Sequence, residues 1–290
     1  MNVTDAQVTA LIQMTEAVNA GDAHGYAAVY AEDARIVILG GNVLEGRKAI
    51  EQYEIELLRQ FPGVRLALYS HWQKGDEAVV HYGVTAPVPG GRTMGHEGLL
   101  FYRFHGSGLI AEERRYNDSL TPMAQMGMLG PTRPRSVPIL PAETAVHQAR
   151  STPEEERNSG LVRAMLEAID SADEAAFLSR LADDVVIDEL ILPDPFVGKS
   201  AARDWFMMWT CAASEAATTI TTMMGAGDFV LLETTSDFKL KGSLGPVAPS
   251  NGSVSVHRAG IFQMKDERLV RASFFMNGRE LAEAAGQWPL

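Results

Sequence analysis

The sequence repeats itself, and this repeat limits the range of folds more than any other feature of the chain. Segments of the first half recur in the second half at an offset of 151 or 152 residues. The matches are Asn19-Ala20-Gly21-Asp22 with Asp170-Ser171-Ala172-Asp173, Tyr26 with Phe177, Asp33 with Asp184, and Gly46-Arg47-Lys48-Ala49 with Gly198-Lys199-Ser200-Ala201. Near the ends of the copies Asp118 corresponds to Asn277 and Gly127 to Gly286, at an offset of 159. An internal repeat of this kind indicates that one structural unit occurs twice.

The length and one proline-rich segment agree with a division into two domains. Single domains usually hold about 100–150 residues, whereas this chain has 290. Between residues 130 and 156 the sequence shows little hydrophobic periodicity and contains Pro131, Pro134, Pro138, Pro141 and Pro153. Such a segment is typical of an extended connection. We therefore predict a first domain over residues 1–130, a linker over 131–154 and a second domain over 155–290.

The hydrophobic pattern of the first copy changes from a helical to a strand period along its length. Apolar residues recur every three to four positions near the N-terminus, whereas glycine-rich turns separate strand-like runs later on. The pattern predicts helices over about 8–18, 23–30 and 46–60, a strand over 35–39, and long strands over 65–72, 77–86, 93–104 and 109–118. Hairpin-connected strands that pack on helices make an α+β fold with an antiparallel sheet.

The charge and the cysteine content exclude several classes of protein. The net charge is −12 and the pI is near 5.1, so the chain lacks the basic surface that nucleic acids and anionic membranes require. The single cysteine, Cys211, cannot form an intramolecular disulfide or a thiolate-only zinc site, and we expect it to be buried. The seven histidines show no metal-binding spacing, so we expect no metal and no other cofactor. Because no signal peptide or long apolar run occurs, we expect a cytoplasmic protein.

Three segments of the first copy resemble a known superfamily. They are Asn-Ala-Gly-Asp with Tyr-Ala-Glu-Asp-Ala in residues 19–34, Glu-Gly-Arg-Lys-Ala-Ile in 45–50, and Glu-Glu-Arg-Arg-Tyr-Asn-Asp followed by Gln-Met-Gly in 112–127. With their counterparts in the second copy, they resemble the nuclear transport factor 2-like superfamily and, within it, the SnoaL-like polyketide cyclase group. The resemblance implies two tandem cone-shaped domains, each a curved antiparallel sheet packed on about three helices around an apolar pocket.

The resemblance also implies where an acid/base group lies. In such relatives an aspartate at a strand end, before a Gln-x-Gly signature, commonly transfers protons, and here that position is Asp118. Members that resemble ketosteroid isomerases or open epoxides carry a further carboxylate where this chain has Ile38. The second copy has carboxylates there, Asp188 and Glu189, but Asn277 in place of the aspartate. Each copy thus departs from a complete site in a different way, and the second is expected to be degenerate.

The hairpin over residues 93–118 brings a histidine to this aspartate. If Ser107 lies at the centre of a Gly-Ser-Gly turn, His96 faces Asp118 directly across the two strands. A carboxylate fixes the tautomer of a histidine and stabilises its cation, so the pair can act as a general acid or base near neutral pH. The sequence therefore predicts a His–Asp dyad.

The second copy and a slipped register give alternatives to this dyad. A turn at residues 266–268 pairs His257 with Asn277, which cannot stabilise a histidine cation as well as a carboxylate does. The dyad can also be an ordinary cross-strand polar pair. A turn that is shifted by one residue places Asn117 opposite His96 instead.

Further polar residues extend the candidate site. By strand alternation Arg114 and Tyr116 share a sheet face with Asp118, and Arg114 either stabilises an oxyanion or forms an ion pair with Glu112. Four more side chains either line the cavity or belong to an ordinary core: Tyr30, Tyr53, Tyr69 and His81. In the second copy three carboxylates either open an epoxide or are solvated: Asp188, Glu189 and Glu215.

Three functional hypotheses follow. The first is a cofactor-independent acid/base enzyme, a cyclase, isomerase, dehydratase or carbon–carbon lyase, that acts on a small apolar and aromatic or polycyclic substrate. The second is a small-molecule binding protein without catalysis, and the third is an epoxide-opening hydrolase or cyclase that uses the second domain. In each case we expect a small apolar partner, neither nucleic acid nor membrane, and two domains that pack as a pseudo-dimer. Further homo-oligomerisation stays open.

Overall fold

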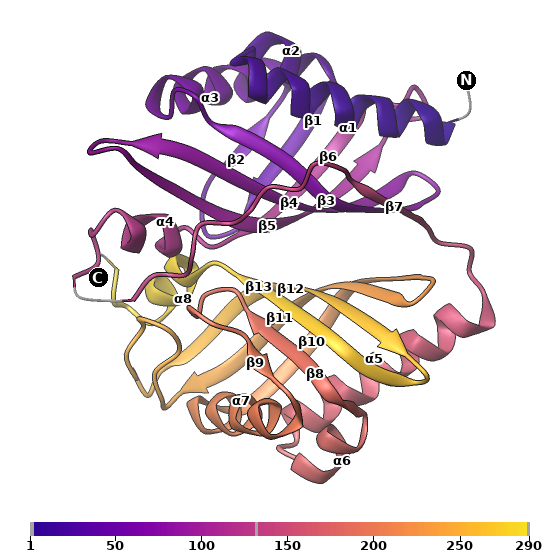
Figure 1. The fold of residues 1–290 in the computed structure, drawn as a ribbon, viewed down its shortest axis with the longest axis vertical. Helices are drawn as coiled ribbons and strands as arrows, with labels where there is room; N and C mark the ends of the chain where they lie inside the picture. The colour runs from indigo at the N-terminus through magenta and orange to yellow at the C-terminus, as the bar shows by residue number, and fades with distance from the viewer. Residues whose placement is uncertain (1–2, 131–132, 289–290) are drawn as a thin grey trace. The chain divides into compact units, whose positions relative to one another are not determined.

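Two compact units make up the computed structural model, which describes residues 3–130 and 133–288. The first unit consists of Met1–Asn117 and Ser136–Gln148, and the second of Asp118–Arg135 and Ala149–Leu290. Each unit combines one mainly antiparallel sheet with helices, so the chain is an α+β protein with two tandem domains (Figure 1).

The first unit has a seven-stranded sheet in the order β2-β1-β6-β5-β4-β3-β7. Its elements are α1 (Val3–Ala20), α2 (Ala23–Ala28), β1 (Tyr30–Ile38), β2 (Val43–Glu45), α3 (Arg47–Gln60), β3 (Arg65–Lys74), β4 (Glu77–Val88), β5 (Arg92–Phe104), β6 (Ile110–Asn117) and β7 (Ala145–Gln148). Strands β3 to β6 form the expected antiparallel meander, whereas β1 pairs with β6 and β7 pairs with β3 in parallel.

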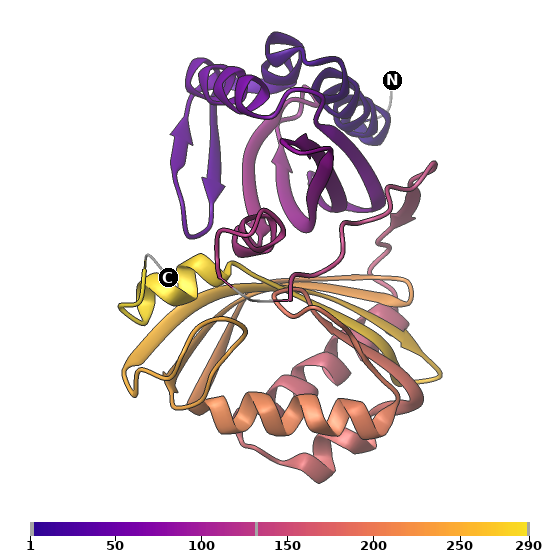
Figure 2. The same ribbon diagram turned by 60° about the vertical axis from the view of Figure 1, so that its left-hand side comes forward.

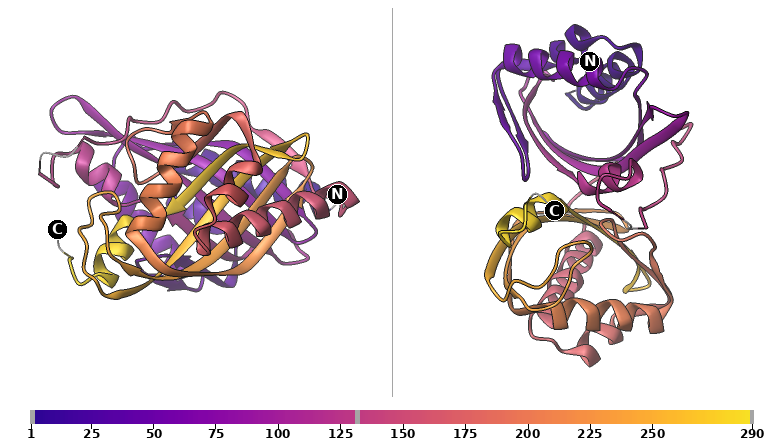
Figure 3. Two further views of the ribbon diagram at one scale, coloured as in Figure 1. Left: turned by 90° about the horizontal axis from the view of Figure 1, so that it is seen from below. Right: turned by 90° about the vertical axis from the view of Figure 1, so that its left-hand side faces the viewer.

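The second unit repeats this order in a six-stranded sheet, β10-β11-β12-β13-β8-β9. Its elements are α4 (Leu120–Gln125), α5 (Pro153–Asp170), α6 (Glu174–Ser179), β8 (Leu181–Glu189), β9 (Phe196–Val197), α7 (Lys199–Ala212), β10 (Ala213–Ala226), β11 (Phe229–Leu240), β12 (Ser253–Lys265), β13 (Arg268–Met276) and α8 (Gly278–Ala284). In each unit the sheet curves, and helices α1, α2 and α3 of the first unit and α5, α6 and α7 of the second cover its concave side (Figures 2 and 3).

The repeated sequence motifs occur where the backbone has special requirements. Asp22 and Asp173 cap α2 and α6, because each side chain accepts a hydrogen bond from the backbone N–H three residues later. Gly46 and Gly198 precede α3 and α7 with the same φ of 83°, a conformation that disfavours other residues. The two copies therefore share helix starts, and this shared local geometry preserves the repeat.

The boundaries of the units differ from the predicted domains. Residues 118–130 belong to the second unit, although the sequence repeat assigns them to the first copy. The segment 131–154, in which we expected only an extended linker, contains β7 and the start of α5; its first two residues lie outside the described residues. Cys211, which we expected to be buried, is exposed.

The β5–β6 hairpin does not have the predicted register. Phe104 pairs with Ile110 as expected, but a bulge then shifts the ladder by one residue, so that Gly98 pairs with Asn117. Strand β6 ends at Asn117, and the shifted register does not place Asp118 opposite His96. The predicted dyad geometry is therefore wrong, as is the alternative that pairs Asn117 with His96.

In the second unit the predicted turn at residues 266–268 is wrong, because Lys265 pairs with Arg268. A bulge between Gln263 and Met264 then brings the ladder into the predicted register, from Gln263 with Arg271 onward. Arg258 pairs with Met276, so His257 and Asn277 come next at the end of the ladder. The ring of His257 hydrogen-bonds to Glu280 of α8 at 2.6 Å, and this bond raises the pKa of the histidine. The histidine thus keeps a carboxylate partner even though its predicted neighbour is an amide.

Asp118 and Asn277 form part of a reciprocal pair of helix starts. The carboxylate of Asp118 accepts hydrogen bonds from the first turn of α4, at Leu120 N (3.1 Å) and at the N and Oγ1 atoms of Thr121 (2.8 and 2.6 Å). It also accepts one from the backbone N–H of Gly278 at the start of α8, at 3.0 Å. Asn277 Oδ1 in turn accepts from Ser119 Oγ at 2.9 Å. Both residues therefore have clear structural roles.

We predict that Asp118→Ala lowers the free energy of unfolding of the second unit by roughly 2–4 kcal/mol, because four buried donors lose their acceptor. The matched control is Asp22→Ala, which removes an exposed cap that accepts one hydrogen bond, from Gly25 N, and should cost about 1 kcal/mol. Urea denaturation measures both values. Equal losses in the two variants would contradict this account of Asp118.

Candidate functional site

The concave face of the first sheet carries an unusual number of polar side chains. The register places Gln73, Ala78, Tyr102 and Glu113 in one row across β3, β4, β5 and β6. The next row consists of His71, Val80, Leu100 and Arg115. Tyr102 donates a hydrogen bond to the sulfur of Met14 on α1, so these rows face the helices. The interior of this unit is therefore partly charged.

The centre of this interior is an ion pair on β6. Glu113 is fully buried and accepts a hydrogen bond from Arg115 Nε at 2.7 Å. The hydroxyl of Tyr30 donates to the same carboxylate, and Arg115 Nη2 donates to Tyr26 at 3.1 Å. The two tyrosine hydroxyls lie 3.0 Å apart. Tyr26, Tyr30, Glu113 and Arg115 thus form one network, which we call the β6 network.

Burial sets the protonation states in and beside this network. It raises the pKa values of Tyr26 and Tyr30, and the charge of Glu113 raises them further, so both remain protonated. Burial also raises the pKa of Tyr82 on β4. Burial opposes the charge of Arg115, but the neighbouring Glu113 carboxylate raises its pKa above the usual range. The interior therefore offers one fixed cation and several neutral hydroxyl donors.

Glu54 is the residue of this interior that can exchange a proton near neutral pH. It lies on the buried side of α3 with 3% of its surface exposed, and no hydrogen bond to it occurs among the described residues. Burial raises its pKa from 4.5 to about 7, with Arg115 lowering and Glu113 raising it. A carboxyl group with these properties is suited to general acid/base catalysis.

The structure brings three of the predicted site residues to this interior. Tyr30 belongs to the β6 network, and Tyr53 is the half-buried neighbour of Glu54 on α3. His96 follows the alternation of the concave face, and its ring meets the ring of Tyr82 edge-on at 6.0 Å. Burial and the charge of Arg115 lower the pKa of His96 to about 4, so its imidazole is neutral. Its catalytic role stays a prediction.

The remaining predicted residues of the first unit lie on the opposite face of the sheet. Arg114 forms an ion pair with Glu112 at 2.9 Å, which was the alternative to an oxyanion role. Tyr116 packs edge-on against Phe101, with ring centroids 5.7 Å apart. His81 bonds to Glu97 at 2.9 Å and stacks on Tyr69. The bulge in the β5–β6 hairpin explains the placement of Arg114 and Tyr116, since a shift by one residue exchanges the two faces of a strand.

Sequence reasoning missed five of the interior residues, although two signals were present. The apolar stripe of α3 runs through Ile50, Tyr53 and Leu57, and Glu54 occupies the remaining position of that stripe. In β6 four consecutive residues, 112–115, are charged, and successive side chains of a strand point to opposite faces, so one Glu and one Arg had to face the interior under either register. The missed residues are Tyr26, Glu54, Tyr82, Glu113 and Arg115.

The second unit has none of this chemistry at the corresponding positions. The repeat replaces the members of the first interior by apolar residues, namely Tyr26 by Phe177, Tyr30 by Leu181, Glu54 by Phe206, Glu113 by Ala272 and Arg115 by Phe274. These replacements are all buried. They form part of the hydrophobic core of that unit.

A different ion pair occurs in the second interior. Arg258 donates to Glu189 at 2.8 Å, and its guanidinium lies 3.9 Å from the centre of the Trp209 ring and 4.8 Å from that of Phe274. Burial lowers the pKa of Arg258 and raises that of Glu189. The two predicted carboxylate neighbours are separated, because Asp188 pairs instead with Arg135 through two bonds of 2.9 Å.

Glu215, the third carboxylate that we considered in the second unit, is bound at the surface. Its carboxylate accepts a hydrogen bond from Lys239 Nζ at 2.7 Å, and this bond lowers its pKa. Among the described residues, no three His, Cys, Asp or Glu side chains lie close enough together to hold a metal ion. The helices of residues 3–130 and 133–288 are also too short or too polar to span a membrane.

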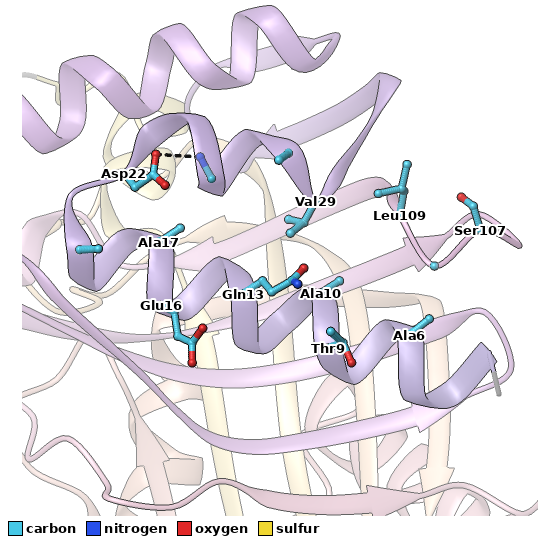
Figure 4. Close-up of a pocket in the computed structure, with 14 residues that line it drawn as sticks. Ala6, Thr9, Ala10, Gln13, Glu16, Ala17, Asp22, Val29, Ser107 and Leu109 are labelled. Atoms are coloured by element: carbon cyan, nitrogen blue, oxygen red, sulfur yellow. Dashed lines mark hydrogen bonds between the residues drawn. The ribbon is translucent and has the colours of Figure 1, made fainter. Parts of the chain in front are cut away.

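A surface groove of about 620 Å³ lies along α1, away from the β6 network. It runs between α1, α2 and the β5–β6 turn, and small side chains such as Ala6, Ala10 and Ala17 line much of it (Figure 4). Its polar side chains include Thr9, Gln13 and Glu16, and none of them lies in a concave row. The groove therefore does not extend the candidate site.

Comparison with known proteins identifies the family. The SnoaL-like domain matches residues 11–113 and 162–272, more than half of the chain, and the protein belongs to this family with two copies of the domain. No curated protein matches the sequence.

Solved structures of similar fold each cover about half of the chain. A protein from Jannaschia sp. CCS1 assigned to the SnoaL-like polyketide cyclases is 14% identical over 49% of this chain and 99% of its own, with a TM-score of 0.44. An LEH-like epoxide hydrolase from M. tuberculosis is 17% identical over 47% and 93%, with a TM-score of 0.39. A protein with a ketosteroid isomerase-like fold from Catenulispora acidiphila is 18% identical over 47% and 95%, also with a TM-score of 0.39.

The raised pKa of Glu54 predicts a pH dependence of stability. Between pH 4.5 and about 7 the folded protein keeps a proton on Glu54 that the unfolded chain has lost, so its contribution to stability is complete at low pH and disappears as the pH rises. The loss amounts to at most about 3 kcal/mol. Glu54→Gln should remove this part of the dependence, whereas Glu56→Gln, on the exposed side of α3, should retain it. Urea denaturation at pH 5 and pH 8 measures the difference, and identical profiles for both variants would refute the raised pKa.

Proposed function

We propose that the first unit is a cofactor-independent acid/base enzyme that moves a proton on a small apolar substrate, with Glu54 as the general base. The observation that carries this proposal is a buried carboxyl group with a pKa of about 7 and no hydrogen bond to the described protein. Such a group is half-ionised near neutral pH. A large fraction of it is then deprotonated, and it is still basic enough to remove a proton from a substrate. A purely structural buried carboxyl group would normally be hydrogen-bonded.

The groups near Glu54 can stabilise the negative charge that forms when a substrate loses a proton. Removal of a proton next to a carbonyl group places negative charge on an oxygen atom, and fixed hydrogen-bond donors stabilise that charge. Arg115 supplies a permanent positive charge, which Glu113 and Tyr26 hold in position. Tyr82 supplies a protonated hydroxyl on the same face of the sheet. Because the donors are already oriented by the protein, little reorganisation accompanies the reaction.

The general base and the hydrogen-bond donors define the class of reaction more narrowly than they define the substrate. Cyclases, isomerases, dehydratases and carbon–carbon lyases all need one base and one site for oxyanion charge in a pocket that excludes water. The aromatic side chains of the same interior, Tyr53, Tyr82 and Tyr102, favour an aromatic or polycyclic substrate over an aliphatic one.

The second unit is better explained as a scaffold than as a second active site. Its interior carries aromatic side chains at the positions of Tyr26, Glu54 and Arg115, and each of its two adjacent carboxylates, Asp188 and Glu189, is paired with an arginine. These pairs oppose a role as nucleophile or base in epoxide opening. The alternative for the first unit is a binding protein without catalysis. The variant Glu54→Gln distinguishes this alternative from an acid/base enzyme.

We predict that Glu54→Gln lowers kcat/KM by about 10²–10⁴-fold on a substrate found by screening aromatic carbon acids, while the substrate still binds. In the unchanged protein kcat/KM should rise with pH and level off above about 7, as Glu54 loses its proton. Glu56→Gln is the matched control and should leave the rate and the pH profile unchanged. Turnover that persists within threefold in Glu54→Gln would exclude Glu54 as the base.

A further inference from the structure

Three neutral polar side chains are buried in the first unit at β3, which lies three strands away from β6 in the sheet. Gln7 of α1 is fully buried, and His71 and Gln73 of β3 are 2% and 1% exposed. Gln7 Nε2 donates to the backbone oxygen of Gly75 at 3.2 Å, which places this side chain beside the end of β3. His71 and Gln73 are two residues apart on the same face of the strand. We call these three side chains the β3 recess.

Four side-chain atoms of the β3 recess lack a hydrogen-bond partner within the described part of the chain. They are Gln7 Oε1, His71 Nε2, Gln73 Nε2 and Gln73 Oε1. A single buried group without a partner costs a factor of about 5 to 150 in the folding equilibrium constant. Native proteins avoid such costs, and several unpartnered atoms on neighbouring residues are exceptional. The concentration of these atoms in one place indicates that another molecule completes their hydrogen bonds.

The chemistry of the recess defines what it can bind. Burial lowers the pKa of His71 to about 4, with His147 lowering it further, so the imidazole carries no charge at neutral pH. Both glutamines are neutral, and together they present amide donors and carbonyl acceptors. An anion or a cation would lose its hydration without meeting an opposite charge. An uncharged group that both donates and accepts hydrogen bonds, such as water, an alcohol or an amide, fits these atoms.

We infer that Gln7, His71 and Gln73 form a binding site for an uncharged hydrogen-bonding group. This group is either an ordered internal water or the hydroxyl or amide end of a small molecule. The site is separate from Glu54 and Arg115, because the rows of the sheet place three strand spacings, about 14 Å, between Gln73 and Glu113. The inference therefore does not depend on the catalytic role of Glu54.

A high-resolution crystal structure of the full chain as purified gives the direct test. We expect electron density within hydrogen-bond distance of at least two of the four unpartnered atoms. A compact spherical peak identifies water, and elongated density identifies the polar end of a bound molecule. Side chains that bond only to one another, or contacts with apolar atoms alone, would overturn the inference.

The sign of a stability change gives an independent test. If the recess binds a polar group, Gln73→Leu removes contacts from that group and should raise the unfolding equilibrium constant at least tenfold. If the atoms have no partner, the same change removes a desolvated amide and should leave the constant unchanged or lower it. The matched control, Gln13→Leu on the exposed side of α1, should change the constant less than threefold.

A second variant keeps this test decisive if Gln73→Leu does not fold. His71→Phe is close in shape and removes the unpartnered Nε2 atom. An unfolding constant at least fivefold higher than that of the unchanged protein supports a bound group. An equal or lower constant contradicts it.

Discussion

The ion pair between Glu113 and Arg115 governs the interior of the first unit. Two charges have been removed from water there, and loss of either partner would leave the other uncompensated at a cost of about 3–5 kcal/mol. The pair also orients Tyr26 and Tyr30, whose hydroxyls complete the hydrogen bonds of its members. Burial is the main cause of the raised pKa of Glu54, and the two charges of the pair modify it in opposite directions, with Arg115 lowering and Glu113 raising it.

The tandem fold was predictable because local signals and the repeat agreed. Asp22, Gly46 and their counterparts mark the same helix starts in both copies, and the hydrophobic periods distinguish helices from strands. The site was less predictable, because the face of a strand depends on a single bulge. The bulge between Arg103 and Phe104 placed Arg114 and Tyr116 outside and Glu113 and Arg115 inside. No feature of the turn sequence reveals that bulge.

Glu54, in contrast, is a candidate site residue that could be predicted from the sequence. Its position in the apolar stripe of α3 favours burial, and burial raises the pKa of a carboxyl group that has no cation three or four residues away on its helix. The role of Asp118 could not be predicted from the sequence, because its hydrogen bond with Gly278 joins residues 160 positions apart. Family resemblance favoured the aspartate, whereas the periodicity of the helix pointed to the glutamate.

The two interiors show how one backbone supports different contents. In the first unit a Cβ atom at Gly98 would lie 2.5 Å from the ring of Tyr82, so glycine makes room for that tyrosine. At the corresponding place in the second unit Arg258 pairs with the smaller Thr234, and the arginine side chain occupies the space beside Trp209. The large side chain of the pair thus lies on one strand in the first unit and on the neighbouring strand in the second. This exchange changes the chemistry of the interior and leaves the sheet intact.

The bond from Gly278 to Asp118 has a consequence for biosynthesis. Helix α4 is translated directly after β6, yet its buried aspartate receives this partner only after a further 160 residues. At usual rates of synthesis that interval lasts roughly 10–30 s. During this time the capping hydrogen bonds of Asp118 come only from the first turn of α4, so the end of the first copy reaches its final structure only after Gly278 has been synthesised.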